Sequence, residues 1–256
     1  MCLVVFAHNS HPNYKFIFAA NRDEFYDRPT EQADFWKDRP DLLAGKDLKG
    51  GGTWMGITKA GKFAAITNYR DLYNIKEDAP TRGLLVTDYL LGDQSSEDYY
   101  DSLKKDLSDY NGFNLILGDL NNLYFFSTHA DGLRKINTGV HGLSNAVLDT
   151  PWPKVEKSKK HFLKLMQHEE LHAWELLSLL SDTRKAKEKD LPDTGVGIEW
   201  EKVLSSVFIQ SPNYGTRCST AVLIDNNNNV RFAEKTFFGN QGAFSNKDYN
   251  FTIEEN

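Results

Sequence analysis

The sequence has very little cysteine and no long hydrophobic run. Cys2 and Cys218 are the two cysteines among 256 residues. Two thiols are too few for a disulfide framework, and alone they cannot hold a zinc knuckle or an iron–sulfur cluster. This scarcity is typical of a reducing compartment, so we predict a cytoplasmic protein. The apolar run at residues 1–7 has no basic flank, and no run approaches the roughly 18 residues of a membrane span, so we expect no integral membrane segment.

Proline and basic charge are also scarce. With 8 Pro, 40% hydrophobic and 26% charged residues, the composition is that of a globular protein and not of a disordered or collagen-like chain. A formal net charge of −6 disfavours nucleic acid or an anionic membrane surface as the main partner, because either needs a basic face. This argument leaves room for a local basic patch. Since no repeat, linker or composition shift occurs, we predict a single domain over residues 1–256.

Motifs for metals and nucleotides are incomplete. His168-Glu-Glu-Leu-His172 matches the H-E-x-x-H zinc pattern, but no third ligand is evident. The apolar stripe of the surrounding helix would also run through Glu169, so either the helix breaks there or a carboxylate lies in the core. Gly50–Gly52 lacks a following Lys-Ser or Lys-Thr, and no G-x-G-x-x-G occurs. We predict no metal site, with zinc at His168 and His172 as the alternative, and no nucleotide cofactor.

Short apolar stretches bounded by turn residues predict three β-hairpins. Their strands are expected at residues 3–8 and 14–20, 54–58 and 63–68, and 219–224 and 230–235. Further strands are expected at 113–117, 123–127 and 133–136, and helices at 84–91, 99–107, 153–180 and 200–208. Because strands cluster at both termini and helices lie between them, we predict an α+β layered fold whose terminal hairpins join one sheet system.

The first hairpin determines which residue faces Cys2. In an antiparallel pair, the numbers of facing residues add to a constant. A turn centred near Pro12 makes this sum about 24. Cys2 is therefore expected opposite the neighbourhood of Arg22.

Cys2 would carry two reactive groups once Met1 is removed, as is usual before a small residue. The new terminus has a thiol and an α-amine of ordinary pKa roughly 7.7–8.0, which suits the amine as the base for the thiol. Arg22, if opposite, favours the thiolate, and Asp23 is placed to hold the amine. The alternative is a cysteine that merely begins a buried strand, with Asn21–Glu24 as a solvated turn.

Two asparagines at the ends of expected strands are candidate oxyanion donors. Asn68 ends the strand 63–68, and Asn145 follows Gly142-Leu-Ser144. A carboxamide NH₂ aimed at a cleft stabilises a tetrahedral oxyanion by about 3 kcal/mol. Each asparagine taken alone also fits a turn or a cap.

A series of short motifs occurs in order along the chain. They are Met1-Cys2, Asn21–Phe25 with Arg28-Pro29, Gly51–Trp54, Thr67–Arg70, Gly112–Leu115, Gly142–Asn145, Pro151–Lys154, Leu191-Pro192 and Tyr214–Arg217. The series resembles the NRDE family, also called the transport and Golgi organisation protein 2 family, over nearly the whole chain. This resemblance implies a distant likeness to N-terminal nucleophile hydrolases of the penicillin V acylase and bile salt hydrolase branch, and hence a four-layered αββα sandwich.

The acylase likeness also implies a set of site residues. Acylases have a cysteine after Met1, an arginine and an aspartate at the end of the second strand, two later asparagines and an arginine near the C-terminal hairpin. In this sequence the same order is followed by Cys2, Arg22, Asp23, Asn68, Asn145 and Arg217. The arginine and the aspartate are adjacent here, whereas the acylases separate them.

Together these features predict a cysteine amidohydrolase or acyltransferase that acts on an amide or thioester of a small or lipid-like molecule and requires no cofactor. The expected partner is a small-molecule or acyl-type substrate, and no nucleic acid. The alternative is a non-catalytic carrier of haem or of lipid or acyl-coenzyme A, because family members have been connected to haem trafficking and lipid homeostasis. Haem is thus a second candidate ligand, although no C-x-x-C-H occurs. A third option is an interaction scaffold that keeps an enzyme-like fold.

Overall fold

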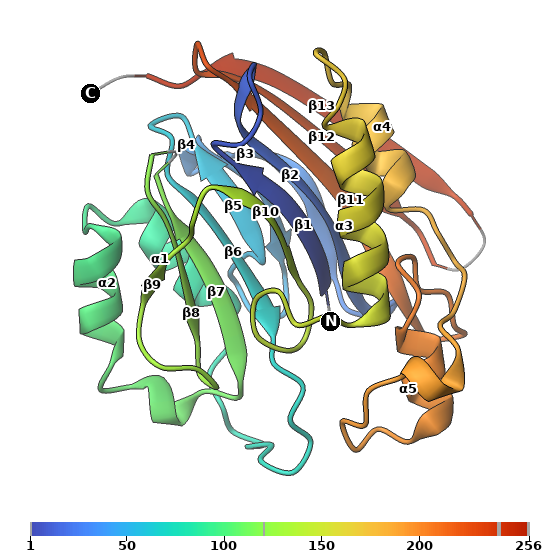
Figure 1. The fold of residues 1–256 in the computed structure, drawn as a ribbon. Coiled ribbons are helices and arrows are strands. Elements are labelled where there is room, and N and C mark those ends of the chain that lie inside the picture. Colours follow the sequence, from blue (N-terminus) through green and yellow to red (C-terminus); the bar gives the residue numbers. More distant parts are fainter. Residues whose placement is uncertain (1, 120, 240–241, 255–256) are drawn as a thin grey trace. The chain divides into compact units, whose positions relative to one another are not determined.

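The computed structural model describes residues 2–119, 121–239 and 242–254, which form two compact units (Figure 1). Unit 1 comprises the chain up to Asp27, together with Thr138–Ser144 and Leu148–Phe251. Unit 2 comprises Arg28–Asn137, Asn145–Val147 and the chain from Thr252 onward. Each unit contains its own sheet and its own helices, and the single domain expected from the sequence stays a prediction.

Unit 1 is built on a six-stranded sheet in the order β10-β1-β2-β11-β12-β13. Its strands are β1 (Cys2–His8), β2 (Tyr14–Phe25), β10 (Gly139–Leu143), β11 (Tyr214–Asp225), β12 (Asn229–Phe237) and β13 (Phe244–Thr252). The N-terminal and C-terminal hairpins meet in this one sheet, as predicted, because β2 pairs with β11 along most of its length.

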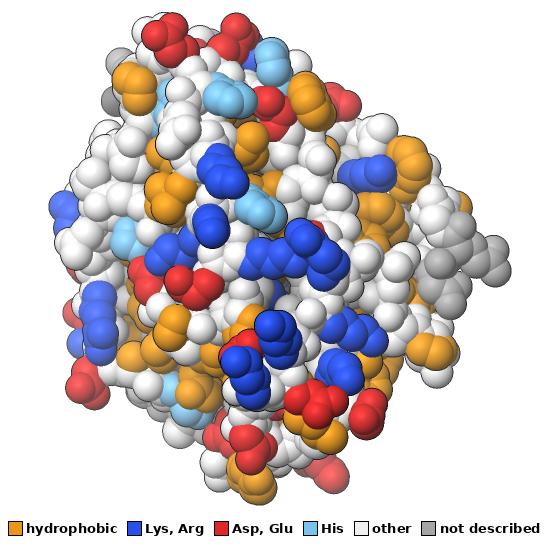
Figure 2. Space-filling view, turned by 45° about the vertical axis from the view of Figure 1, so that its right-hand side comes forward, with side chains coloured by type: hydrophobic (Ala, Val, Ile, Leu, Met, Phe, Trp, Pro, Cys, Tyr) orange, Lys and Arg blue, Asp and Glu red, His pale blue; other side chains and the backbone are white. Residues whose placement is uncertain are grey.

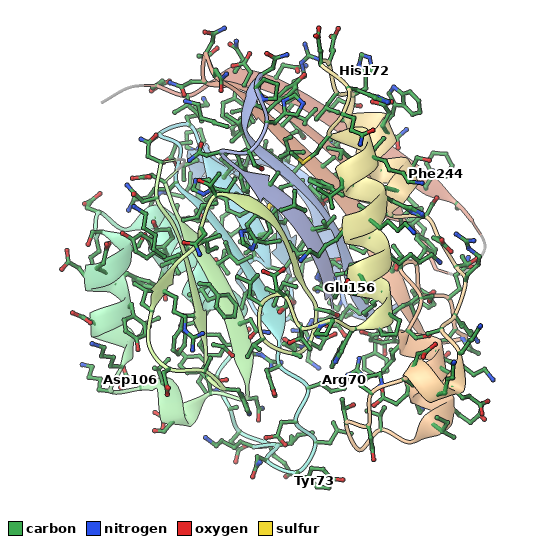
Figure 3. The ribbon with its side chains drawn as sticks, viewed as in Figure 1. Arg70, Tyr73, Asp106, Glu156, His172 and Phe244 are labelled. Carbon is green, nitrogen blue, oxygen red and sulfur yellow. The ribbon has the colours of Figure 1, made fainter. Side chains whose placement is uncertain are left out.

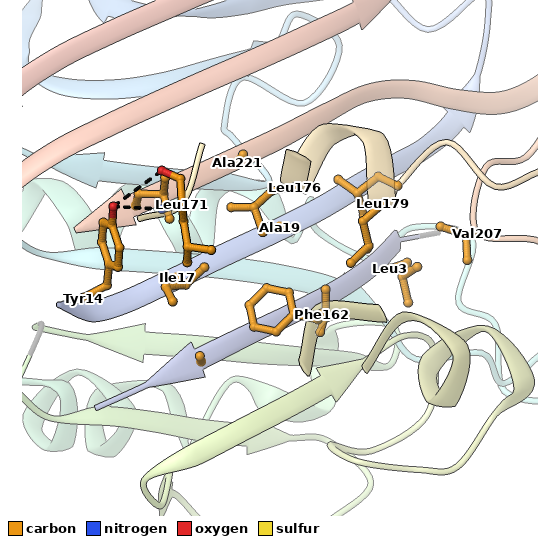
Figure 4. Packing of buried hydrophobic residues seen from close by; sticks show 14 of the residues in the cluster. Leu3, Tyr14, Ile17, Ala19, Phe162, Leu171, Leu176, Leu179, Val207 and Ala221 are labelled. Carbon is orange, nitrogen blue, oxygen red and sulfur yellow. Dashed lines mark hydrogen bonds between the residues drawn. The ribbon is translucent and has the colours of Figure 1, made fainter. Parts of the chain in front are cut away.

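Helices α3 (Pro153–Leu165) and α4 (Ala173–Leu179) pack on one face of this sheet (Figures 1 and 4); a short helix, α5 (Ile198–Leu204), completes the unit. The shared core consists of Leu3, Val5, Ala7, Tyr14, Ile17, Ala19, Val155, Phe162, Leu171, Leu176, Leu179, Leu180, Val207, Ala221 and Leu223. From Phe16 onward in β2 and throughout β1, the odd-numbered residues therefore point to the helices, a face that we call the helix face; Tyr14 lies beyond a register shift and joins the same core. Since side chains alternate along a strand, the even-numbered residues point to the opposite face.

Unit 2 is built on a seven-stranded sheet in the order β3-β4-β5-β6-β7-β8-β9. Its strands are β3 (Thr30–Trp36), β4 (Arg39–Asp47), β5 (Met55–Thr58), β6 (Phe63–Asn68), β7 (Phe113–Gly118), β8 (Leu123–Ser127) and β9 (Arg134–Lys135). Helices α1 (Gly83–Leu91) and α2 (Ser96–Leu103) pack on it through buried side chains such as Leu85 and Tyr99. The α+β class and the antiparallel hairpins predicted from the sequence are confirmed.

The structure decides two alternatives that the sequence left open. The helical stretch at 153–180 breaks at Glu169 and forms two helices, with residues 166–172 outside both and Glu169 exposed. The solvated turn considered for Asn21–Glu24 is instead strand, since β11 pairs with β2 as far as Phe25. Among the described residues, no helix is both long and apolar enough to cross a membrane.

Candidate functional site

Cys2 begins β1, and the residue opposite it in β2 is Arg22. This pairing confirms the register predicted from the hairpin. Directly opposed residues in an antiparallel pair project from the same face, so the thiol and the guanidinium lie on the opposite face of the sheet from α3 and α4. Both side chains are nearly buried, with exposures of 6% for Cys2 and 8% for Arg22.

Some groups around Cys2 raise the pKa of its thiol, and others lower it. Burial raises the pKa of the Cys2 thiol above its ordinary value, and the Asp23 carboxylate raises it as well. The Arg22 charge and a hydrogen bond from the Asp23 backbone N–H lower it. Because burial outweighs these contributions, the resting thiol is protonated and requires a base to become a nucleophile.

Asp23 follows Arg22 in β2 and therefore lies on the helix face. It is 1% exposed, and Thr216 Oγ1 in β11 donates a hydrogen bond of 2.7 Å to Asp23 Oδ1. Burial raises the pKa of this carboxyl, whereas the positive charge of Lys154 lowers it. Arg22 and Asp23 thus act from opposite faces of one strand, although they are adjacent in the sequence.

Lys154 lies beside the candidate site, and no role was predicted for it from the sequence. It lies in the first turn of α3 and is 2% exposed, which is rare for a lysine. The signal was present in the helical spacing, because Lys154, Ser158 and Phe162 form one buried stripe of α3. A lysine in such a stripe requires a partner inside the protein, and its electrostatic effect on Asp23 identifies that carboxyl as one.

Arg217 occupies a β-bulge beside the same residues. Thr216 pairs with Asp23 and Cys218 pairs with Arg22, so Arg217 has no residue opposite it in β2. A bulge re-aims the side chain of its extra residue, and here Arg217 Nη1 donates to the Phe25 carbonyl at 2.7 Å. Burial lowers the pKa of Arg217, and the nearby Arg22 charge lowers it further.

Cys218 shares the face of Cys2. The pairings Cys2 with Arg22 and Arg22 with Cys218 place the three residues in one row across β1, β2 and β11. Both cysteines are free thiols. Their Cα atoms are two strand spacings apart, roughly 10 Å, which is too far for a disulfide.

Asn21 holds the structure around the site together. It is 0% exposed, and its Nδ2 donates to the carbonyls of Leu180 at 2.9 Å and Val207 at 2.8 Å. Its Oδ1 accepts from Ser219 Oγ at 2.6 Å. The carboxamide thus ties the end of α4 and the segment after α5 to the sheet, which is a structural role.

The remaining two predicted residues belong to unit 2. Asn68 is the last residue of β6, and Asn145 Nδ2 donates to the Asn68 carbonyl at 2.7 Å. The Asn145 carbonyl in turn accepts from the Arg70 N–H at 2.9 Å. Asn145 is 1% exposed, so these bonds fix its side chain against the end of β6.

The structure therefore brings together Cys2, Arg22, Asp23 and Arg217 in unit 1, and joins Asn68 to Asn145 in unit 2. The catalytic roles assigned to these six residues stay predictions. The expected removal of Met1 concerns a residue outside those that the structure describes.

The H-E-x-x-H segment does not form the helical zinc motif. His168 lies in the connection between α3 and α4, and His172 directly precedes Ala173, the first residue of α4 (Figure 3). The His172 backbone N–H is bonded to the Glu175 carboxylate at 3.1 Å, as at an ordinary helix start. Within residues 2–119, 121–239 and 242–254, no group of three or more His, Cys, Asp or Glu side chains is arranged to hold a metal ion.

Unit 1 contains a pocket of about 600 Å³ beside α4. Its apolar wall is formed by Trp174, Leu177, Phe208 and Phe237. Its polar lining includes Ser178, Ser181, Thr183, Gln210, Ser219, Lys235, Asn246 and Asp248. The lining residues Ser181 and Phe208 directly follow Leu180 and Val207, whose carbonyls Asn21 holds.

These features define an α+β protein whose first strand opens with a buried cysteine opposite an arginine. The chain belongs to the Transport and Golgi organisation 2 family, whose match covers residues 1–239, and the family resemblance read from the motifs is confirmed. It is 35% identical over 276 residues to the human Transport and Golgi organization protein 2 homolog, covering 99% of this chain and 100% of that protein. The Drosophila melanogaster Transport and Golgi organization protein 2 is 30% identical over 263 residues, covering 93% of each chain.

Two solved structures are also similar to this chain. The C2A mutant of conjugated bile acid hydrolase from Clostridium perfringens is 12% identical, with a TM-score of 0.43 and coverage of 100% of this chain and 97% of that one. The Caenorhabditis elegans ortholog of N-acylethanolamine-hydrolyzing acid amidase is 11% identical, with a TM-score of 0.44 and coverage of 87% and 92%. At this level of similarity, neither structure bears on the chemistry of this chain.

Proposed function

We propose that this protein is a cysteine N-terminal nucleophile enzyme that cleaves an amide or thioester and passes the acyl group to water or to another acceptor. The observation that carries the proposal is the position of Cys2, which begins β1 opposite Arg22 and next to the backbone N–H of Asp23. The cytoplasmic location inferred from the two free thiols is part of the same proposal.

The proposed reaction begins with proton transfer from Cys2 Sγ to the α-amine that Met1 removal exposes. The thiolate attacks the substrate carbonyl carbon, and the resulting oxyanion collapses to break the bond to the leaving nitrogen or sulfur, which takes the proton from the α-ammonium. Water or another acceptor then gives its proton to the α-amine, attacks the Cys2 thioester and releases the thiol. In hydrolysis, the acyl product therefore gains the hydroxyl group of water, and the leaving group gains a proton.

Each neighbouring side chain has a distinct part in this proposal. Arg22 stabilises the Cys2 thiolate, because it lies directly opposite on the same face. Asp23, whose ionised form the Lys154 charge favours, orients the α-amine by hydrogen bonding. Arg217 completes the polar cluster, and Asn68 and Asn145 are the predicted oxyanion donors.

The test compares the wild-type protein with the Cys2→Ala variant, and uses Cys218→Ala as a matched control because Cys218 lies on the same face beside Arg22. Intact mass before and after treatment with p-nitrophenyl acetate should show a chain that lacks Met1 and gains one acetyl group. Cys218→Ala should gain the same group, and Cys2→Ala should gain none. Acetylation of Cys2→Ala at the wild-type rate, or reactive protein that retains Met1, would rule out the mechanism.

A second function, that of a non-catalytic carrier, is favoured by the 600 Å³ pocket beside α4, whose described lining residues do not include Cys2. Its aromatic wall and its hydroxyl and carboxamide groups fit an amphiphilic organic ligand. The described lining residues offer haem iron none of the His, Cys, Met or Tyr side chains that serve as axial ligands. Haem titration that gives a saturable Soret shift, lost on substitution of a single His or Cys, would favour a carrier of haem at another place in the chain.

A further inference from the structure

Unit 1 carries a strongly basic surface, although the chain as a whole has a net charge of −6. Helix α3 contains five lysines and one glutamate, Glu156. The segment 183–189 contains four basic residues and one glutamate. Figure 2 shows Lys and Arg side chains gathered on the face that brings these elements forward. We use the term basic face for the surface formed by Lys157, Lys160, Lys164, Arg184, Lys185 and Lys187.

The spacing of the α3 lysines places them on one side of the helix. Lys157, Lys160 and Lys164 are separated by three and four residues, so their side chains lie above one another along the same face. Lys160 and Lys164 are exposed. The opposite side of α3, which includes Val155 and Phe162, is buried against the sheet, so the lysines project away from the core.

An ion-pair cluster holds the segment 182–187 beside α3. Asp182 accepts from Lys157 Nζ at 2.6 Å and from Arg184 Nη2 at 2.6 Å. These bonds lower the pKa of Asp182 well below its ordinary value. The Ala186 N–H donates to Ser205 Oγ at 2.9 Å, which fixes the other end of the segment. Asp182 thus ties the start of this segment to α3, and the exposed Lys185 and Lys187 follow within five residues.

Leu163 adds an apolar group to the same surface. It lies three residues after Lys160 and directly before Lys164, and half of its side chain is exposed (50%). Lysines flanking an exposed leucine on one helix side are typical of a helix that lies on a lipid surface, where the ammonium groups meet anionic headgroups and the apolar group enters the interface.

The type of cation also favours a lipid surface over nucleic acid. Direct readout of base edges favours the planar fork of arginine. The arginine of this surface, Arg184, is already engaged with both carboxylate oxygens of Asp182. The groups that remain are flexible lysine ammonium groups, which suit a diffuse field of negative charge.

We propose that the basic face of α3 and the segment 184–187 docks this protein on membranes that contain anionic phospholipids. The docking is peripheral and electrostatic, and it is independent of the chemistry at Cys2. It also accounts for a localised positive surface on an acidic protein, since uniform basicity is unnecessary when one face alone approaches the membrane.

The test is co-sedimentation with vesicles of phosphatidylcholine containing roughly one third phosphatidylserine, compared with vesicles of phosphatidylcholine alone. Wild-type protein should bind the anionic vesicles in low salt and be released as salt rises, because screening weakens the attraction. Each lysine near an anionic surface strengthens binding about fivefold. The triple variant Lys160→Gln, Lys164→Gln and Lys185→Gln should therefore bind roughly 100-fold more weakly.

A matched variant, Lys37→Gln, Lys49→Gln and Lys105→Gln, removes the same charge from exposed positions of unit 2 and should bind like the wild type. Leu163→Ser should weaken binding without changing its salt dependence. No binding of the wild type to anionic vesicles in low salt would overturn the proposal. So would equal losses in the two triple variants. Binding of a random oligonucleotide with no binding of vesicles would replace the membrane with nucleic acid.

Discussion

Arg22 lies directly opposite Cys2 across β1 and β2, and the two side chains share one face of the sheet. This relationship brings a permanent positive charge to a buried thiol whose pKa is otherwise raised by burial. It does not by itself produce a thiolate, so the proposed chemistry depends on the α-amine that acts as base.

Replacing Arg22 should make the Cys2 thiol less reactive. In Arg22→Leu the opposing charge is gone, so the pKa of Cys2 should rise further. We expect alkylation of Cys2 by iodoacetamide near neutral pH to be roughly three- to tenfold slower, with the pH profile displaced to higher pH. The measurement should be made in a Cys218→Ala background, because Cys218 also lies beside Arg22. An unchanged pH profile would show that Arg22 does not act on the thiol.

Asn21 should matter for stability more than for chemistry. Asn21→Ala leaves the buried carbonyls of Leu180 and Val207 without their donor and removes the acceptor of Ser219. An unsatisfied buried group costs about 1–3 kcal/mol, so the free energy of unfolding should fall by about 3 kcal/mol or more. Urea denaturation followed by circular dichroism measures this change. The control Ser219→Ala loses one bond and should cost about 1 kcal/mol; equal losses in the two variants would contradict the assignment.

Lys154 should limit how strongly the free energy of unfolding depends on pH through the ionisation of Asp23. The pKa of Asp23 is raised in the folded protein. The stability linked to it is therefore fully present below the ordinary carboxyl pKa and is lost as the pH rises through the folded-state value. Lys154→Met removes the cation that limits this loss. The free energy of unfolding should then fall more steeply from about pH 4 to 7 than in the wild type.

The double variant Lys154→Met with Asp23→Asn provides the control for this prediction. Asparagine does not ionise, so the additional pH dependence should disappear in the double variant. The double-mutant cycle would give no coupling between Lys154 and Asp23 if the two charges acted independently.

Asp149 should stabilise the fold against acid. Its carboxylate accepts hydrogen bonds from His141 Nδ1 at 2.7 Å, Lys159 Nζ at 2.8 Å and the Gly142 N–H at 2.9 Å. Burial opposes ionisation here, but these bonds prevail and lower the pKa of Asp149 to about 2. The linked stability is present above the ordinary carboxyl pKa and is lost as the pH falls through about 2. After allowance for partial exposure, it amounts to about 1–2 kcal/mol.

The Asp149→Asn variant should therefore be less stable than the wild type at neutral pH. At strongly acidic pH the stabilities of the two proteins should be nearly equal. Asparagine tolerates the positive backbone φ of 61° at this position and retains an acceptor for Gly142. Thermal unfolding at several pH values should show the two curves converging as the pH falls. A constant difference at every pH would indicate that the effect comes from packing.

The sequence by itself determined those features that depend on neighbours along the chain. The opposition of Cys2 and Arg22 followed from the length of one turn, because an antiparallel hairpin fixes its register locally. The strands ending at Asn68 and Ser127 were predicted from their apolar pattern and bounding turns. The alternative of a break near Glu169 was visible in the helical stripe, since a charged residue interrupted it.

Tertiary structure alone decided the features that depend on distant partners. β2 continues through Asn21–Glu24 because β11 supplies hydrogen bonds along that edge, which no local pattern reveals. Strands β3, β4, β10 and β13 were not predicted, because strands rich in polar residues, proline or glycine require a paired neighbour to form. The burial of Lys154, the bulge at Arg217 and the division of the candidate residues between two units likewise arise from packing of segments far apart in the chain.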